Sequence, residues 1–316
     1  MAVAEPSSSA ASSAPVIANG TVVTLPSVVS LRQSGSDFVK HLSLTGHEGE
    51  VFMCLWSPLT KQVASGSSDG MCRLWNLVDL TDAQWDSPDK TELRLRTSIL
   101  PHSDAKSDKN KDVTSVAWSP GGLFLATGCY DGTARIWDSN GKLKAELKDH
   151  TGPVFSLKWS KSGAHLLSGS YDRRTIVWSL ATGTAVKSFL LHSAPVLDVD
   201  WKDGDTFATC STDCSIIVCS LSSPHTNALH KFTGHTDEVN TVSWSPGGDY
   251  IASCSDDSTA KIWTVDGLLH NLTGHAKEIY TLRWTPTGQG SVNADKALLL
   301  CTASFDGTVK VMIVLY

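Results

Sequence analysis

Short runs of alternating apolar and polar residues, separated by turns, follow one another along most of this chain. The clearest example alternates over 238–244, turns at 246–248, continues as an apolar run over 250–254, turns at 256–258 and ends in a third run at 259–263. Alternation with a period of two is typical of half-buried β-strands, and proline, glycine and aspartate mark the turns between them. Helical periodicity is absent, so the pattern predicts an all-β protein.

Tryptophan shows that these runs are copies of one unit. One tryptophan ends the first alternating run of each copy, and from the second copy onward these residues are 40–43 residues apart. A fixed period of this length is typical of propeller blades built from four strands. The six residues are Trp56, Trp118, Trp159, Trp201, Trp244 and Trp284.

Four residue types recur once per repeat at fixed spacing. A histidine stands nine residues before the first tryptophan, an aspartate ends the next apolar run, a hydroxyl side chain precedes that aspartate by four residues, and a second tryptophan follows it by six. Repeat two has Lys109 at the histidine position, with His102 out of register, while Cys219 and Met312 replace the second tryptophan in repeats four and six. The remaining members, in chain order, are His47, Ser65, Asp69, Trp75, Thr127, Asp131, Trp137, His150, Ser168, Asp172, Trp178, His192, Thr209, Asp213, His235, Ser253, Asp257, Trp263, His275, Thr302 and Asp306.

These four residue types suit a buried chain of hydrogen bonds. The aspartate accepts from the histidine, the histidine from the hydroxyl, and the hydroxyl from the indole N–H, so that every buried polar group has a partner. A hydrolase triad also uses Ser, His and Asp, and residues 66–70 match G-x-S-x-G. That match lies between two strands, and its elements recur in every repeat, so we expect a structural network and no enzyme. For repeat two we expect the histidine link to be missing.

The spacing and the Gly-His and tryptophan signature are those of WD40 β-propeller blades. The chain further resembles the transducin beta-like 1 family of corepressor proteins over approximately residues 37–311, in segments 46–54, 111–115, 192–201, 210–213 and 275–280. The resemblance implies a nuclear protein of a transcriptional corepressor complex, with corepressor and histone deacetylase subunits and histone tails as partners.

The chain also departs from that family. Members of the family carry LisH and F-box-like segments before the propeller, and their propeller resembles a ring of eight blades. This sequence resembles a form that lacks the N-terminal region and is truncated at its C-terminus. We therefore expect six recognisable four-stranded blades and a ring that closes imperfectly. Residues 39–44 have the position of an outer strand that would complete the sixth blade if the six repeats closed as a small ring. The domain prediction is a disordered Ser/Ala-rich tail over 1–36 and a propeller over 37–316, with a disordered polar insert over 80–111.

Composition narrows the function. The formal net charge of −6 lacks the basic footprint of a protein that reads DNA directly, and no apolar stretch is long enough to cross a membrane. Eight cysteines are scattered without a C-x-x-C pair, which is typical of reduced structural cysteines, so no metal and no other cofactor is expected. We expect no small-molecule substrate either.

A candidate binding face follows from the repeats. Gly-His loops and aspartate turns share one face, and the residues four and six positions before each first tryptophan, together with the residue before each aspartate, approach its rim. Carboxylates beside exposed aromatic rings suit a basic peptide such as a histone tail, whereas acidic rims also simply keep a propeller in solution. The candidates are Glu50, Phe52, Asp112, Tyr130, Phe155, Tyr171, Glu238, Asn240, Asp256, Glu278, Tyr280 and Phe305.

Two functions remain open from the sequence. The first is a non-catalytic scaffold of a nuclear corepressor complex that binds basic histone-tail-like peptides and partner proteins, as the family resemblance implies. The alternative is a general WD40 adaptor, such as a ubiquitin-ligase substrate receptor or a cytoplasmic signalling scaffold, because propellers serve many unrelated pathways.

Overall fold

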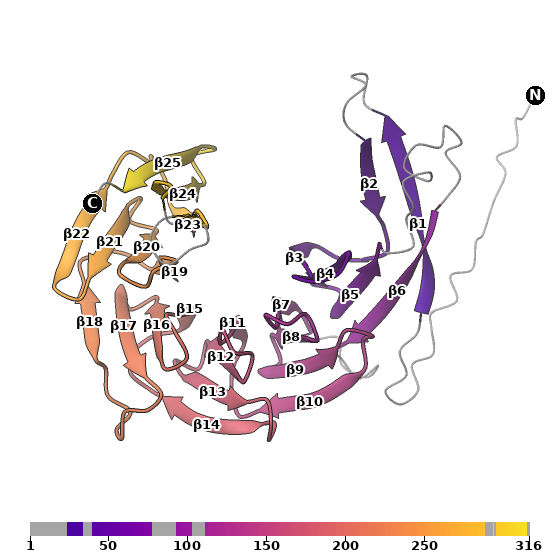
Figure 1. Ribbon diagram of the computed structural model, residues 1–316, viewed down its shortest axis with the longest axis horizontal. Coiled ribbons are helices and arrows are strands. Elements are labelled where there is room, and N and C mark those ends of the chain that lie inside the picture. The colour runs from indigo at the N-terminus through magenta and orange to yellow at the C-terminus, as the bar shows by residue number, and fades with distance from the viewer. Residues whose placement is uncertain are drawn as a thin grey trace, which may run out of the picture.

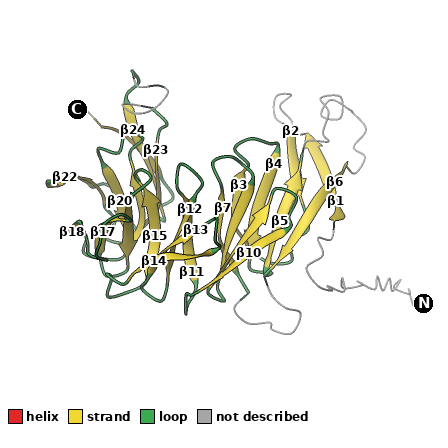
Figure 2. Ribbon diagram, turned by 60° about the horizontal axis from the view of Figure 1, so that its bottom comes forward, coloured by secondary structure: helices red, strands yellow, loops and turns green. Residues whose placement is uncertain are grey.

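Six antiparallel sheets stand side by side in an open arc. The computed structural model describes residues 24–33, 40–77, 93–102, 111–287, 293 and 295–314. Within these residues every regular element is a strand, as Figure 2 shows, and no helix is present that is long and apolar enough to span a membrane. In the four-stranded sheets the first strand lines the inside of the arc and the fourth strand lies on its outside (Figure 1). The predicted all-β propeller of six blades that does not close is thereby confirmed.

Blades two to five have the predicted four strands each. Consecutive strands in each of these sheets pair antiparallel. Their bounds are β7 (Val113–Trp118), β8 (Phe124–Cys129), β9 (Thr133–Asp138), β10 (Leu143–Lys148), β11 (Val154–Trp159), β12 (His165–Ser170), β13 (Thr175–Ser179), β14 (Thr184–Phe189), β15 (Val196–Trp201), β16 (Thr206–Ser211), β17 (Ser215–Ser220), β18 (His230–Thr233), β19 (Val239–Trp244), β20 (Ile251–Ser255), β21 (Ala260–Thr264) and β22 (Gly267–Leu272).

Blade one is larger than predicted. Its sheet has six strands in the order β2-β1-β6-β5-β4-β3. The bounds are β1 (Thr24–Gln33), β2 (Lys40–Leu44), β3 (Val51–Trp56), β4 (Gln62–Ser67), β5 (Met71–Asn76) and β6 (Leu93–Pro101). Part of the sequence expected as tail therefore forms β1, and part of the expected disordered insert forms β6. The rest of the tail and of the insert lies outside the described residues.

Blade six has three strands, β23 (Ile279–Trp284), β24 (Leu298–Ser304) and β25 (Val309–Val314). The segment that would complete this blade in a closed ring contains β2, and β2 pairs with β1 instead. The physical reason is that β1, which the sequence prediction placed in the tail, directly precedes β2 and provides a nearby antiparallel partner. Blades one and six face each other across the opening in Figure 1.

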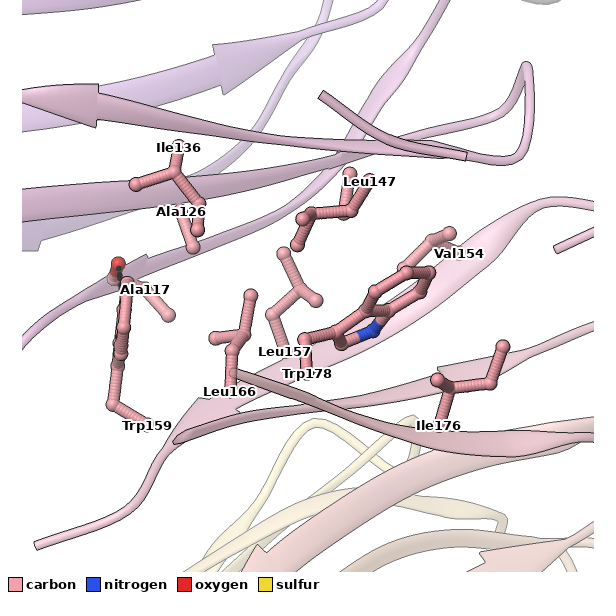
Figure 3. Close-up of a cluster of buried hydrophobic side chains, with 11 residues drawn as sticks. Ala117, Ala126, Ile136, Leu147, Val154, Leu157, Trp159, Leu166, Ile176 and Trp178 are labelled. Atoms are coloured by element: carbon pink, nitrogen blue, oxygen red, sulfur yellow. Dashed lines mark hydrogen bonds between the residues drawn. The ribbon is translucent and has the colours of Figure 1, made fainter. Parts of the chain in front are cut away.

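The core lies between blades. Figure 3 shows one such cluster, in which Ile136 and Leu147 of blade two lie near Leu157, Leu166 and Trp178 of blade three. Small residues in the second strand allow this close approach. At Gly169 a Cβ atom would lie 2.8 Å from Cγ1 of Val196 in blade four, closer than real Cβ contacts allow.

The first tryptophans also join the blades by hydrogen bonds. The indole N–H of Trp159 donates to the carbonyl of Ala117 over 3.0 Å, and Trp201 and Trp284 bond in the same way, over 3.1 Å each, to Lys158 and Ser243 of the preceding blade. Each carbonyl belongs to the residue just before the preceding repeat's first tryptophan. Among the described residues no blade precedes blade one, and its Trp56 is 64% exposed.

Candidate functional site

The four recurring residues meet in each complete repeat. In blade five the Nδ1 atom of His235 lies 2.8 Å from Oδ2 of Asp257, and its Nε2 atom lies 2.8 Å from Oγ of Ser253. The indole of Trp263 donates to the same hydroxyl over 2.8 Å. The Oδ2 atom of Asp257 also accepts from the backbone N–H of Thr236, so one carboxylate ties the Gly-His loop to the turn.

Blades one, three, four and six contain the same arrangement. His47, His150, His192 and His275 each contact the aspartate and the hydroxyl of their repeat over 2.7–3.0 Å. In blades one and three the indole closes the chain with bonds of 2.8 Å. In blades four and six the hydroxyl receives no indole, because cysteine and methionine stand there.

Blade two corrects the sequence prediction. The expectation that it lacks a histidine link is wrong: Nε2 of His102 lies 2.6 Å from Oγ1 of Thr127, which also accepts from Trp137. Fixed spacing missed this residue because the strand of the insert, β6, delivers it from an unusual position in the chain. Asp131 does not take part in the hydrogen-bond network of blade two. Its carboxylate instead binds the guanidinium of Arg135 over 3.1 Å. Lys109 lies outside the described residues.

The aspartates of the network are held ionised. Burial raises the pKa of Asp69, but the hydrogen bonds from His47 and from the backbone of Glu48 outweigh it and lower the pKa to about 2. The same balance lowers the pKa of Asp172 and of Asp213. An ionised aspartate orients each imidazole so that its Nδ1–H points to the carboxylate.

In blades one, three and five the Ser, His and Asp side chains contact one another as in a hydrolase triad. Unlike the nucleophile of such a triad, the serine hydroxyl is not accessible to a substrate. The side chains of Ser168 and Ser253 are fully buried, and each hydroxyl accepts an indole N–H. A nucleophile has to reach the carbon that it attacks, and no substrate reaches these oxygens. Within the described part of the chain, no group of His, Cys, Asp and Glu side chains is arranged to hold a metal ion.

The candidate binding residues gather most closely where blades five and six meet. The rings of Tyr280 and Phe305 lie 5.2 Å apart and are 49% and 64% exposed. The Nδ2 atom of Asn240 donates to Oδ1 of Asp256 over 2.6 Å and to the carbonyl of Ile279, the residue before Tyr280. The backbone N–H of Phe305 donates to the carbonyl of Glu278, which is exposed.

Glu238 adds a third carboxylate to this set. Glu238 is an exposed residue. The part of it that is buried contributes most to raising the pKa of its carboxyl group, and the negative charges of Asp256 and Asp237 raise it further. Crowded carboxylates of this kind are stabilised by a cation. We call Glu238, Asn240, Asp256, Glu278, Tyr280 and Phe305 the acidic-aromatic patch.

The other candidates lie in the earlier blades. The rings of Phe155 and Tyr171 in blade three form a second pair with 6.3 Å between centroids, and Tyr171 is 58% exposed. Tyr130 is 42% exposed, and its backbone N–H donates to the carbonyl of the half-buried Asp112. In blade one Glu50 and Phe52 are exposed as well. These residues form a series along the Gly-His face and do not join the acidic-aromatic patch in one cluster.

Sequence reasoning missed two aspartates on the inner strand β15. Asp198 accepts from Ser156 of blade three over 2.7 Å, and Asp200 accepts from the backbone N–H of Trp244 in blade five over 2.8 Å. Burial raises the pKa of Asp200. The signal was available, because carboxylates in an otherwise apolar inner strand need buried partners, and the neighbouring blades supply them.

The repeat assignment agrees with comparisons to known proteins. The profile of the "WD domain, G-beta repeat" matches residues 38–76, 101–138, 141–179, 183–220, 226–264 and 267–311. The chain is similar in fold to the crystal structure of the C-terminal WD40 domain of Sif2, with a TM-score of 0.65 at 23% identity over 92% of this chain and 75% of that one.

Two curated relatives are more similar in sequence. The WD40 repeat-containing protein HOS15 of Arabidopsis thaliana is 50% identical over 84% of this chain and 43% of that protein. The F-box-like/WD repeat-containing protein TBL1Y of Homo sapiens is 48% identical over 65% of this chain and 38% of that protein. The chain thus spans less than half the length of both relatives. It belongs to the WD-domain, G-beta repeat family, and within that family it is homologous to HOS15 and to the transducin beta-like proteins.

Proposed function

We propose that this protein is a non-catalytic scaffold in the nucleus, where it holds a transcriptional corepressor complex with histone deacetylase subunits on chromatin by binding basic histone tails. The observation that carries the proposal is the acidic-aromatic patch. Exposed rings at Tyr280 and Phe305 stand beside carboxylates at Glu238, Asp256 and Glu278, and the homology to transducin beta-like proteins supports the choice of complex.

A lysine or arginine side chain of the tail binds here in two ways. Its cation faces the ring pair, where the interaction contributes about 0.5–1 kcal/mol at an exposed site. The same cation lies within the field of Glu238 and Asp256, which relieves the repulsion between these two carboxylates. The rigid Gly-His loops and aspartate turns hold the patch in place before the peptide arrives, so that little loop entropy is lost on binding.

Charge removal on this face tests the proposal. Replacing Glu50, Glu238 and Glu278 together by glutamine should weaken the binding of a synthetic histone-tail peptide by about tenfold at low salt and flatten its salt dependence, because exposed ion pairs contribute about 0.2–1 kcal/mol each and are screened by salt. Isothermal titration at two ionic strengths measures both effects.

A matched triple variant on the opposite face is the control. It removes the same number of negative charges at the exposed residues Asp249, Asp266 and Asp295. We expect this variant to bind the peptide like the wild type. Equal affinities for all three proteins at both salt concentrations would refute the patch as the peptide site.

Partner identity is tested separately by affinity purification from nuclear extract. Recovery of histone deacetylase and corepressor subunits supports the scaffold role. Recovery of cullin-based ubiquitin-ligase subunits in their place would refute it and favour a substrate receptor.

A further inference from the structure

Blade six has an outer edge that no strand covers in the described part of the chain. Its sheet has the order β23-β24-β25, so the third strand, β25, is an edge strand at one end of the arc (Figure 1). In blades two to five the equivalent third strand pairs antiparallel with a fourth strand. The backbone N–H and C=O groups on the outer edge of β25 are therefore available to pair with another extended segment.

The apolar side chains of β25 are exposed where the other blades bury theirs. Val309 and Val311, three and five residues after the repeat aspartate, are 65% and 62% exposed. The residues at these two positions in the other five blades are only 0–3% exposed. A segment that pairs with β25 and carries a large apolar side chain next to Val309 reduces this exposure.

The four-stranded blades show which kind of residue belongs opposite Val309. In each of them the fourth strand places a large apolar residue directly opposite the Val309 position, namely Leu147, Phe189, Phe232 and Leu272. Directly opposite residues lie on the same face of a sheet and contact each other. A strand that pairs with β25 in the same register thus needs a leucine or a phenylalanine opposite Val309.

Lys310, the next residue of β25, adds a requirement of charge. Among the four-stranded blades, blades two and five also have a basic residue at this position, and in both the fourth strand places an acceptor directly opposite. Nε of Arg135 lies 3.3 Å from Oε1 of Glu146. Nζ of Lys261 donates to Oδ1 of Asn271 over 2.6 Å. The half-buried Lys310 has no such acceptor among the residues that the structure describes.

We propose that β25 binds an extended segment of a partner polypeptide as the fourth strand of blade six, and that this segment carries an acidic residue followed by leucine or phenylalanine. In antiparallel pairing the acidic residue lies opposite Lys310 and the apolar residue opposite Val309, as Glu146 and Leu147 of β10 lie opposite β9. The backbone hydrogen bonds provide affinity, and the two side chains provide selectivity. The site is independent of the acidic-aromatic patch, because that patch attracts a cation whereas this edge binds an acidic, apolar strand.

The probe is the blocked peptide Lys-Leu-Lys-Ala-Glu-Leu-Lys-Asp, which has the sequence of residues 142–149 and contains the fourth strand of blade two. Hydrogen–deuterium exchange of the full chain, followed by mass spectrometry, shows where it binds. We expect the peptide to slow exchange in residues 309–314, because the outer edge of β25 becomes hydrogen-bonded. Exchange in β22, the outer edge strand of blade five, should stay unchanged.

Charge exchange at Lys310 tests the register of the pair. Lys310→Glu should weaken binding of the glutamate peptide by about tenfold, because an attraction becomes a repulsion. The variant should instead prefer a peptide with lysine in place of this glutamate, which the wild type should bind more weakly. Lys161→Glu makes the same change at an exposed position in blade three and should behave like the wild type. Fluorescence anisotropy of dye-labelled peptides measures these affinities.

The apolar position is tested on the peptide itself. Replacing its second leucine by serine should weaken binding by about fivefold or more, since this leucine covers Val309. Equal affinities for the leucine and serine peptides would contradict the assigned pairing.

The exchange measurement on the wild type decides the question even if Lys310→Glu does not fold. Protection that is absent from residues 309–314, or equally strong in β22, would overturn the proposal. A folded Lys310→Glu variant that still prefers the glutamate peptide would do so as well. Analytical ultracentrifugation tests a second copy of the chain as the occupant: a dimer in which residues 309–314 are protected before peptide is added would refute the partner strand.

Discussion

Lowering the pH from 7.5 to 5 should destabilise the fold through one histidine of blade two. His102 is 3% exposed, and burial followed by the charge of Arg135 lowers its pKa to about 3. The other network histidines place Nδ1 on a carboxylate, whereas Nδ1 of His102 lies 3.0 Å from the carbonyl of Leu100. The histidine of blade two therefore stays neutral in the folded protein, while the unfolded chain protonates it near pH 6.5.

The sign and the magnitude follow from proton linkage. Between pH 6.5 and 3 the unfolded state binds one more proton at this site than the folded state, so the free energy of unfolding falls as the pH falls. With a pKa of about 3 in the folded protein, the loss between pH 7.5 and 5 is about 2 kcal/mol. His102 therefore contributes its full stabilisation only at a pH above its pKa in the unfolded chain.

Urea unfolding of wild type and His102→Gln at both pH values measures this loss. Glutamine does not titrate, so the wild type should lose about 2 kcal/mol more than the variant between pH 7.5 and 5. The double difference cancels the contribution of all other groups. An exposed histidine, His270, provides the control, because His270→Gln should follow the wild type. Equal losses for wild type and His102→Gln would show that His102 is not held neutral and would refute the reasoning.

Two further variants test the network and the packing between blades. Asp257→Ala should reduce the free energy of unfolding by about 1–3 kcal/mol, because it leaves buried donors of blade five unsatisfied, whereas Asp266→Ala at an exposed turn should stay within about 0.5 kcal/mol of the wild type. Gly169→Ala should cost about 1–3 kcal/mol, because the new methyl group meets Val196, and Gly121→Ala, which has open space around it, should be nearly neutral. Thermal or urea unfolding measures each pair, and equal stabilities within a pair would contradict the assigned contact.

The repeat units were predictable because each is a local pattern. Residues such as His235, Ser253 and Asp257 recur at fixed spacing, and turns of fixed length bring them together in space. The departures lie in segments that the repeat pattern does not cover. The alternating run in β6 was hidden in a polar insert, and with it His102, while β2 pairs with β1, a strand that was expected to be part of the tail.

The candidate binding face was predictable only in part. Strand alternation identified the exposed rings of Tyr280 and Phe305, but their contact and their place beside Asp256 depend on how two blades pack. The unpartnered indole N–H of Trp244 gave no sequence signal at all, since Trp244 fits the repeat pattern as well as Trp201 does. What distinguishes Trp244 is the missing acceptor, which is a property of the interface between blades four and five.

The open arc also determines where the protein unfolds first. Each inner blade is covered on two sides, whereas blade one leaves Val51 and Trp56 uncovered and blade six leaves Val309 and Val311 uncovered, all at least half exposed. In a linear array of coupled units, a terminal unit opens at the cost of a single interface. Backbone amide hydrogens should therefore exchange with solvent fastest in blades one and six and slowest in blades three and four. Local unfolding then starts at both ends of the arc and proceeds toward its middle.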